Sequence, residues 1–347
     1  MVVKKLKNQS MNVQENLIKE AEKVFLQNFK AETWFERAIF FSWACKLETC
    51  CKYCYMSALP KEKRTKEKVR SFASLLAETL LCKHLGWKIG FLSGGIGIFS
   101  NKEIISLLSK MNEILNEKIW INIGTMDETR LKELKPYIEG VVGTVEVLDP
   151  SLHKEICPSK PLEDVERMFR CSQKLHIKNG MTLIVGLGET IDDFNLLKKF
   201  IQKYDIQKIH IYGLNPQKGT EFENALPPTP EYQAEWIART RITFPKIDIQ
   251  MGIWKDRVSR VGLLLKAGAN SISKFPATSQ FGTKYAQEIE NQATLAGRRF
   301  KGTMTKMPKV DWKKEIEDLS FDSTLKKQIS HKLEQYLAKM QRNTTCR

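Results

Sequence analysis

Short hydrophobic runs alternate with longer charged stretches along most of the chain. The hydrophobic runs are rich in β-branched residues or end at glycine, which is typical of buried strands. We place eight strands at residues 38–43, 89–93, 120–123, 141–147, 181–185, 208–212, 247–252 and 269–273. In the charged stretches, apolar residues recur at intervals of three and four, as in helices that cover a sheet. These helices are predicted at residues 66–84, 102–115, 128–137, 162–175, 193–204, 231–240 and 258–266.

This strand–helix alternation predicts an α/β fold, with a (β/α)8 barrel of the TIM type. An open doubly wound sheet is the alternative. One helix is predicted at residues 12–35, and residues 283–345 are predicted to be mostly helical. We therefore divide the chain into an N-terminal helical extension (1–35), the barrel (36–282) and a C-terminal helical extension (283–347).

Composition narrows the classes of protein to be considered. Hydrophobic residues make up 42% of the 347 residues, enough for a sizeable core and too many for general disorder. No apolar run approaches the roughly 20 residues that span a bilayer, and the N-terminus holds no apolar signal segment. We expect a soluble, cytoplasmic protein with no membrane partner. The net charge of +16 is compatible with an anionic partner, but the lysines are spread along the predicted helices, so nucleic acid is not the favoured partner.

Cysteine spacing points to a metal or redox site. Four cysteines fall within ten residues: Cys45, Cys50, Cys51 and Cys54. A disulfide framework would spread its cysteines along a short secreted chain instead. Three thiolates on a flexible loop can hold an iron–sulfur cubane and leave one iron open to a substrate or cofactor. A four-thiolate zinc site is the alternative, although such sites usually pair two separated C-x2-C knuckles. We interpret the remaining cysteines as buried or incidental thiols: Cys82, Cys157, Cys171 and Cys346.

The segment Cys51-Lys52-Tyr53-Cys54 resembles the second half of the radical S-adenosylmethionine (SAM) signature, in which an aromatic residue precedes the last cysteine. The usual signature has its first cysteine at the position of Leu47, whereas this chain has Cys45, giving C-x5-C-x2-C. That spacing resembles the radical SAM proteins encoded beside [Fe]-hydrogenase, and biotin-synthase-like features recur along the whole chain. The resemblance implies a [4Fe–4S] cluster on Cys45, Cys51 and Cys54. The set Cys45, Cys50 and Cys54 remains an alternative.

The resemblance also assigns residues to SAM, which would bind the open iron. Ser93, Gly94 and Gly95 match the motif that contacts the methionine amino group. Glu146 matches a polar strand end that contacts the ribose or the amino group, and Asp149 could share that role. Arg167 matches an arginine that would pair with the carboxylate through its planar fork, with Arg170 as the alternative. The adenine is assigned to Tyr53, Ile184 and Val185. Gly186, which begins a segment that resembles biotin synthase, is also assigned to cofactor binding. Thr190 with Asp193 is interpreted as a helix N-cap.

Further polar residues fall at predicted strand ends, and most are expected to be ordinary rim packing: Asn122, Thr125, Tyr212, Asn215, Trp254, Lys255 and Ser273. No cysteine lies between Cys171 and Cys346, so the second cluster of a sulfur-inserting enzyme is disfavoured.

The sequence thus favours a radical SAM enzyme that cleaves SAM reductively to a 5′-deoxyadenosyl radical and acts on a small molecule. The resemblance implies a part in forming the pyridinol of the iron–guanylylpyridinol cofactor, by carbon–carbon bond formation or rearrangement. A ferredoxin or flavodoxin would supply the electron. Two alternatives remain: a radical SAM enzyme that modifies RNA, and a non-enzymatic iron–sulfur or zinc protein.

Overall fold

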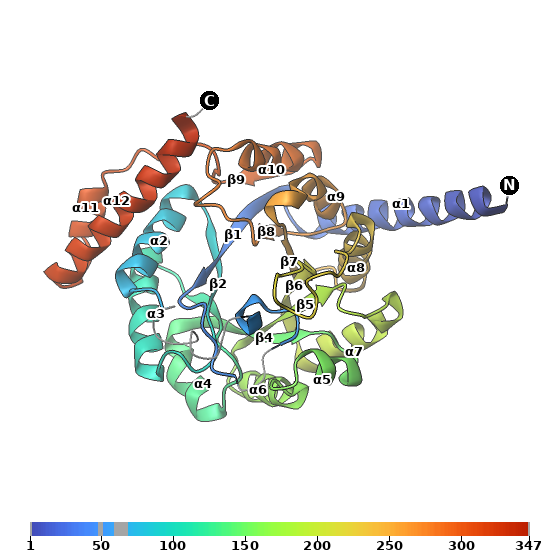
Figure 1. Cartoon of the computed structure of the whole chain (residues 1–347), viewed down its shortest axis with the longest axis horizontal. Helices are drawn as coiled ribbons and strands as arrows, with labels where there is room; N and C mark the ends of the chain where they lie inside the picture. The colour runs from blue at the N-terminus through green and yellow to red at the C-terminus, as the bar shows by residue number, and fades with distance from the viewer. Residues whose placement is uncertain (1, 48–50, 59–68, 346–347) are drawn as a thin grey trace.

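A closed barrel of eight parallel strands forms the centre of the protein (Figure 1). The computed structural model describes residues 2–47, 51–58 and 69–345. Strand β1 pairs with β2 on one side and with β8 on the other, which closes the sheet. The strands are β1 Glu32–Phe40, β2 Lys88–Ser93, β3 Ile119–Asn122, β4 Ile138–Glu146, β5 Lys178–Val185, β6 Ile206–Gly213, β7 Asp248–Gly252, β8 Ser271–Ser273 and β9 Arg299–Lys301. The predicted α/β barrel is confirmed, and the alternative of an open sheet is wrong.

Helices follow the strands and cover the outside of the barrel (Figure 1). The α-helices are α1 Val2–Asn28, α2 Phe72–Leu85, α3 Asn101–Leu115, α4 Glu128–Leu134, α5 Pro150–Ile156, α6 Leu162–Lys174, α7 Phe194–Tyr204, α8 Pro230–Thr243, α9 Val261–Lys266, α10 Lys284–Leu295, α11 Trp312–Glu317 and α12 Ser323–Thr345. Short 3-10 helices are η1 Tyr55–Ala58, η4 Lys135–Tyr137, η5 Ile191–Asp193 and η6 Lys255–Arg260. Among the described residues, no helix combines the length and the apolar character that crossing a bilayer requires.

The structure differs from the prediction most clearly at β1. This strand begins at Glu32, inside the range assigned to the N-terminal extension, whereas the prediction placed it at residues 38–43. The charged residues Glu36 and Arg37 interrupt the hydrophobic pattern that would have indicated this strand. Each of them forms an ion pair with a residue from a distant part of the chain. The short elements α5 and β9 were also missed, and β9 extends the sheet beside β1.

Two different layers fill the fold. Between the strands and the helices the packing is apolar, with side chains such as Leu80, Leu107 and Ile237 fully buried. The barrel interior instead contains a buried polar network that starts at Tyr212. The Tyr212 hydroxyl donates to Gln250 at 2.7 Å and, having one hydrogen, accepts from the His210 ring at 3.0 Å. Tyr212 therefore connects this buried network to the cavity at the barrel mouth.

An ion pair anchors this network deeper in the barrel. Gln250 donates to Glu36 at 2.5 Å, and the Lys208 ammonium lies 2.8 Å from Glu36 and 2.7 Å from Asp248. Burial alone would raise the pKa of Glu36, but the Lys208 charge and its hydrogen bonds lower that pKa to about 2. The buried carboxylate therefore stays ionised and holds β1, β6 and β7 together from the inside.

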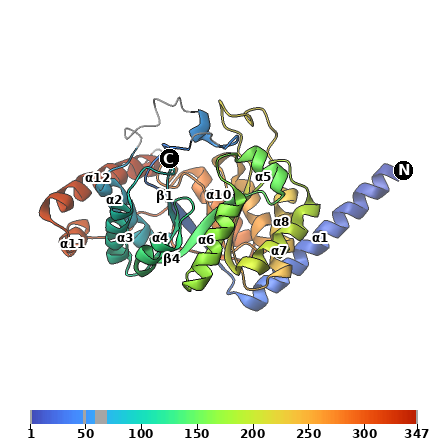
Figure 2. The same ribbon diagram turned by 90° about the horizontal axis from the view of Figure 1, so that it is seen from below.

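The terminal extensions pack on the outside of the barrel. Helix α1 contacts α8 through its C-terminal part, where Ala21 and Phe25 are buried, and its N-terminal part projects away from the barrel (Figures 1 and 2). Helix α12 lies along α2. The Tyr336 hydroxyl accepts a hydrogen bond from Arg70 at 2.8 Å and shares one with the Ser74 hydroxyl at 2.9 Å. The helical character predicted for residues 283–345 is thus observed over much of that range.

Candidate active site

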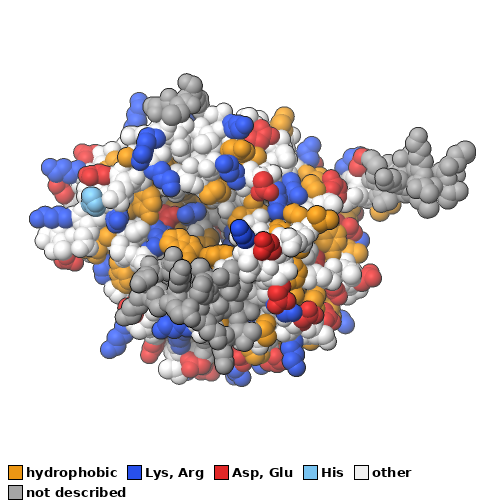
Figure 3. Space-filling model, viewed as in Figure 1, with side chains coloured by type: hydrophobic (Ala, Val, Ile, Leu, Met, Phe, Trp, Pro, Cys, Tyr) orange, Lys and Arg blue, Asp and Glu red, His pale blue; other side chains and the backbone are white. Residues whose placement is uncertain are grey.

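A cavity of about 760 Å³ opens at the carboxyl ends of the strands. Its walls come from the loop after β1, from several strand ends and from Tyr336 and Lys339 of α12. In the space-filling view of this face, hydrophobic side chains surround a hollow near the barrel axis (Figure 3). In an α/β barrel this rim is where catalytic residues gather, because the βα loops meet there.

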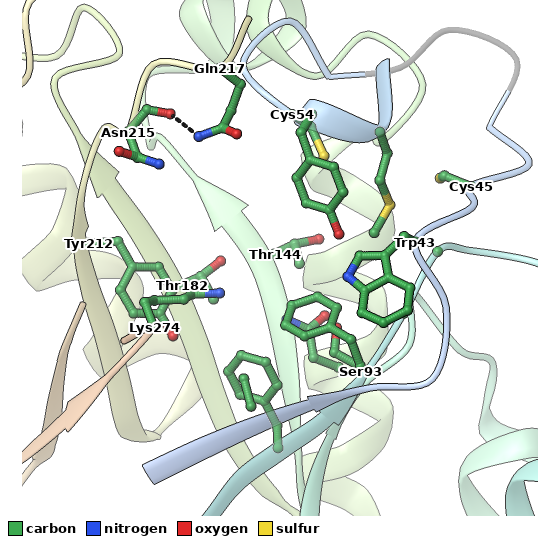
Figure 4. A pocket seen from close by; sticks show the side chains of 18 of the residues that line it. Trp43, Cys45, Cys54, Ser93, Thr144, Thr182, Tyr212, Asn215, Gln217 and Lys274 are labelled. Atoms are coloured by element: carbon green, nitrogen blue, oxygen red, sulfur yellow. Dashed lines mark hydrogen bonds between the residues drawn. The ribbon is translucent and has the colours of Figure 1, made fainter. Parts of the chain in front are cut away.

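Cys45, Cys51 and Cys54 line one part of this cavity. Figure 4 shows Cys45 and Cys54 beside the pocket. The first two are buried, and Cys54 is partly buried. Backbone hydrogen bonds fix the loop on both sides, from Lys46 to Ile96 at 3.0 Å and from Lys52 to Ile156 at 3.0 Å. No group of three or more described His, Cys, Asp or Glu side chains is arranged to hold a single metal ion, but the three thiols on one cavity are soft sulfur donors of the kind that an iron–sulfur cluster takes. Cys50 lies outside the described residues, so the alternative ligand set that includes it is not tested.

The Cys51 sulfur has an environment that the sequence did not reveal. The Cys157 thiol donates a hydrogen bond to it, and the Lys160 ammonium lies beside it; these two contacts lower the pKa of Cys51 to about 6 against the effect of burial. Burial raises the pKa of Cys54 to about 11. Cys157, for which we expected a buried or incidental thiol, is buried and is also part of the site's surroundings.

Lys160 is a buried cation at the centre of this region. Its ammonium lies 3.5 Å from the Glu146 carboxylate. Burial alone would lower its pKa, but Cys51, Cys157 and Glu146 raise that pKa well above the usual range. Lys160 therefore remains charged inside the pocket. Sequence reasoning missed it because it lies in a loop between α5 and α6, where no periodic pattern singles out one lysine.

Glu146 ends β4 and points into the pocket. Its backbone φ of 64° is in the left-handed region, which is uncommon for a residue with a side chain and is typical of functional sites. Besides Lys160, it accepts a hydrogen bond from Thr182 at 3.1 Å. Asp149 is not part of this group, because its carboxylate caps α5 by accepting from the Leu152 amide at 2.8 Å.

The Ser93-Gly94-Gly95 segment lies against the cysteine loop. All three residues line the cavity. A Cβ at Gly95 would lie 1.3 Å from the Ala44 carbonyl oxygen, and one at Gly94 would lie 2.3 Å from the Phe41 ring. Glycine is required here because the cysteine loop crosses directly over the end of β2. This packing role accompanies the expected contact with SAM.

The residues assigned to the adenine divide into two groups. Tyr53 and Ile184 line the cavity. Val185 instead packs in the core between strands and helices, because side chains alternate along β5, so its side chain cannot flank a base in the cavity. Gly186 begins the following turn, where its amide donates to Glu189 at 2.6 Å. The interpretation of Thr190 and Asp193 as a helix cap is confirmed by a capping box.

Arg167 is the assignment that the structure does not support. Its side chain is 66% exposed on α6 and pairs with Asp164 within the same helix. Arg170 is also exposed and lies near Glu166. The buried face of α6 carries Val165 and its apolar neighbours, so both arginines point away from the pocket. Lys160 is the cation that the structure places near the cysteines.

Two comparisons with known sequences agree. The profile of the Radical SAM superfamily matches residues 41–201. The uncharacterized protein MJ0597 of Methanocaldococcus jannaschii is 34% identical over 346 residues, which cover 94% of this chain and 96% of that protein. Biotin synthase of Thermotoga petrophila is 23% identical and covers 72% of this chain and 80% of its own length.

Among solved structures, that of methylornithine synthase (PylB) has a similar fold, with a TM-score of 0.67 at 19% identity. It covers 82% of this chain and 88% of its own. With a closed α/β barrel, three cysteines at its rim and these relatives, the chain belongs to the radical SAM superfamily. It is an enzyme, and the cofactors of its family are a [4Fe–4S] cluster and SAM.

Proposed function

We propose that Cys45, Cys51 and Cys54 hold the [4Fe–4S] cluster and that SAM binds between the cluster and the strand ends of β2, β4 and β5. The three cysteines supply sulfur ligands along one wall of the cavity, and the fourth vertex would face the space lined by Ser93 and Ile184. When bound, the reduced cluster and SAM supply a carbon-centred radical able to abstract hydrogen.

Lys160 and Glu146 are proposed to orient SAM, in the place of Arg167. A buried ammonium suits the SAM carboxylate, and a buried carboxylate suits the amino group or the ribose hydroxyls. Each side chain currently balances the other at 3.5 Å, so both charges are already present and fixed before a ligand arrives. Tyr53 and Ile184 would cover the adenine from the pocket wall.

We further propose that the substrate is a small molecule, and specifically a precursor of the pyridinol of the iron–guanylylpyridinol cofactor, through carbon–carbon bond formation or rearrangement. The observation that carries the first part is the cavity of about 760 Å³, a volume typical of small-molecule sites. The second part rests on the C-x5-C-x2-C spacing of the cysteines.

An RNA substrate has less support. Among the described side chains on the face that carries the cavity, Lys and Arg are interspersed with Asp and Glu (Figure 3). Binding to a phosphate backbone would be favoured by a continuous basic surface. The cavity remains the feature of this face that best suits a substrate.

The decisive experiment is anaerobic incubation of the reconstituted protein with SAM and dithionite, followed by measurement of 5′-deoxyadenosine. We expect turnover by the wild type and by Cys171→Ala, a matched cysteine on α6, and none by Cys45→Ala, Cys51→Ala or Cys54→Ala. Cys50→Ala should also remain active. Activity that survives Cys51→Ala but not Cys50→Ala would overturn the ligand assignment.

The finer proposal is tested by adding a small-molecule extract of a methanogen to the same reaction. A pyridinol-type product that forms only with enzyme and SAM would support it. A product of another chemical class would contradict the pyridinol assignment and leave the radical chemistry in place.

A further inference from the structure

Lys274 directly follows β8 at the mouth of the barrel and lines the cavity. Its backbone φ is 68°, in the left-handed region that favours glycine. A lysine at such a position is held by its surroundings, and strained residues of this kind cluster at ligand sites. Figure 4 shows its side chain beside Tyr212 and across the pocket from Cys45 and Trp43.

Aromatic rings surround the Lys274 ammonium. Its nitrogen lies 4.6 Å from the centre of the Tyr212 ring, 5.4 Å from that of Phe40 and 5.5 Å from that of Phe91. These rings stabilise a cation through their faces but supply no counter-charge. Burial lowers the pKa of Lys274 to about 8, against the attraction of Glu146 and Cys54.

No carboxylate lies within ion-pair distance of Lys274 in the part of the chain that the structure describes, and no hydrogen-bond acceptor contacts it there. The other described cations of the pocket differ. Arg37 and Arg70 pair with Glu78 at 2.5 Å and 2.7 Å. Lys160 is balanced by Glu146, and Lys339 is exposed to solvent. Among the residues that the structure describes, the partly buried Lys274 ammonium therefore has no ion-pair partner, and Glu146 and Cys54 attract it only at longer range.

We propose that Lys274 binds the carboxylate of the substrate, and that the apolar or aromatic body of the substrate lies against Phe40, Phe91 and Tyr212. This deepens the proposed small-molecule function and rests on it. A single unpaired ammonium balances one negative charge, which favours a carboxylate over a phosphate dianion. We assign SAM to the side of Lys160, which contacts Cys51, whereas Lys274 lies across the pocket from Cys45 and acts on Cys54 only through its longer-range attraction (Figure 4).

The test uses the reconstituted holoenzyme with SAM and titrates phenylacetate by isothermal titration calorimetry. Phenylacetamide is the uncharged analogue, and phenyl phosphate is the dianionic one. Lys274→Met keeps the length of the side chain and removes its charge. Lys266→Met, an exposed lysine on α9, is the matched control.

We expect phenylacetate to bind the wild type and Lys266→Met equally, and to bind Lys274→Met with a Kd raised roughly tenfold or more. Lys274→Arg should restore part of the affinity, and phenylacetamide should bind weakly to all variants. The proposal is overturned by equal phenylacetate binding to Lys274→Met, by no binding to the wild type, by stronger Lys274-dependent binding of phenyl phosphate, or by a loss confined to SAM affinity.

These outcomes are separable from failure of the proposed function. If the wild type forms no 5′-deoxyadenosine with dithionite, the proposed radical activity fails. The phenylacetate titration involves no turnover, so it still reports whether Lys274 recognises a carboxylate.

Discussion

At the scale of single residues, the site contains positions where neighbouring atoms lie so close that only one type of residue fits. Gly95 is the clearest of these, because the cysteine loop passes so near that no side chain fits: a Cβ would meet the Ala44 carbonyl at 1.3 Å and the Cys45 Cα at 2.7 Å. The glycines that a motif assigns to a cofactor therefore have a second role, which is to let the ligand loop lie across the strand end.

The first prediction follows from this contact. Gly95→Ala should displace the cysteine loop and reduce the iron bound per chain to well below half of the wild-type content after reconstitution. Gly97→Ala is the control, because its Cβ would lie no nearer than 3.5 Å to Lys46 and the cost is limited to about 1 kcal/mol for its positive φ. Iron and sulfide analysis of both variants provides the measurement, and equal iron content in both would contradict the packing role of Gly95.

How far the site could be predicted also differs from residue to residue. The three cysteines, Ser93 and Glu146 stand at strand ends or in a motif, so local sequence was sufficient to place them at the cavity. Lys160 could not be found in this way, because a lysine in a loop looks the same whether it is solvated or buried. Lys274 stands directly after a strand, but nothing in the local sequence separates it from the other polar residues at strand ends. Tertiary packing is what brings Lys160 and Lys274 into the wall of the cavity.

Arg167 shows the opposite error. The buried stripe of α6 contains Val165, Met168, Phe169 and Ser172 at helical spacing, and Arg167 falls outside it. That stripe was readable from the sequence. The helical pattern indicates a solvent-facing arginine at this position, and it was a better guide than the resemblance to a family motif.

At the scale of elements, helical and strand periodicity predicted the barrel well wherever one face was apolar. It misplaced β1, whose charges are neutralised only by other elements, and it missed α5 and β9, which are too short to show a period. The cluster of Glu78 with Arg37 and Arg70 is such a contact between elements. It joins β1 to α2 and, through Tyr336, to α12.

The second prediction concerns this junction. Glu78→Gln should lower the free energy of unfolding by about 3–5 kcal/mol, because two arginines would remain partly buried without their carboxylate. Glu315→Gln removes a more exposed carboxylate that links α11 to α2 and should cost about 0–1 kcal/mol. Chemical denaturation of the two variants under identical conditions tests the difference. Equal losses would show that the buried cluster does not hold the elements together.

At the scale of the whole molecule, apolar side chains pack between the barrel and the helices that cover it, and the interior contains the polar network of Glu36, Lys208 and Gln250. The pKa of the Glu36 carboxylate is strongly lowered in this network, so the stability of the protein should depend on pH. Folding keeps Glu36 ionised at a pKa of about 2, whereas its ordinary value is 4.5. The unfolded chain therefore binds a proton more readily at acidic pH.

The third prediction is a pH dependence. The stabilisation from Glu36 should be fully present above about pH 5 and should be lost as the pH falls toward 2. Glu36→Gln should destabilise the protein by about 3–5 kcal/mol at pH 7, and the gap between variant and wild type should narrow as the pH is lowered. Glu128→Gln, which removes a surface pair with Lys132, should change little at any pH. Urea unfolding across this range measures the gap, and a constant gap would contradict the shifted pKa.

We propose that Cys45, Cys51 and Cys54 at the barrel mouth hold a [4Fe–4S] cluster whose remaining iron is open to SAM. Mössbauer spectroscopy of the protein reconstituted with ⁵⁷Fe tests it most directly. Addition of SAM should change the isomer shift and quadrupole splitting of one iron site, while the three sulfur-ligated sites stay as they were. A spectrum that SAM leaves unchanged would contradict the account.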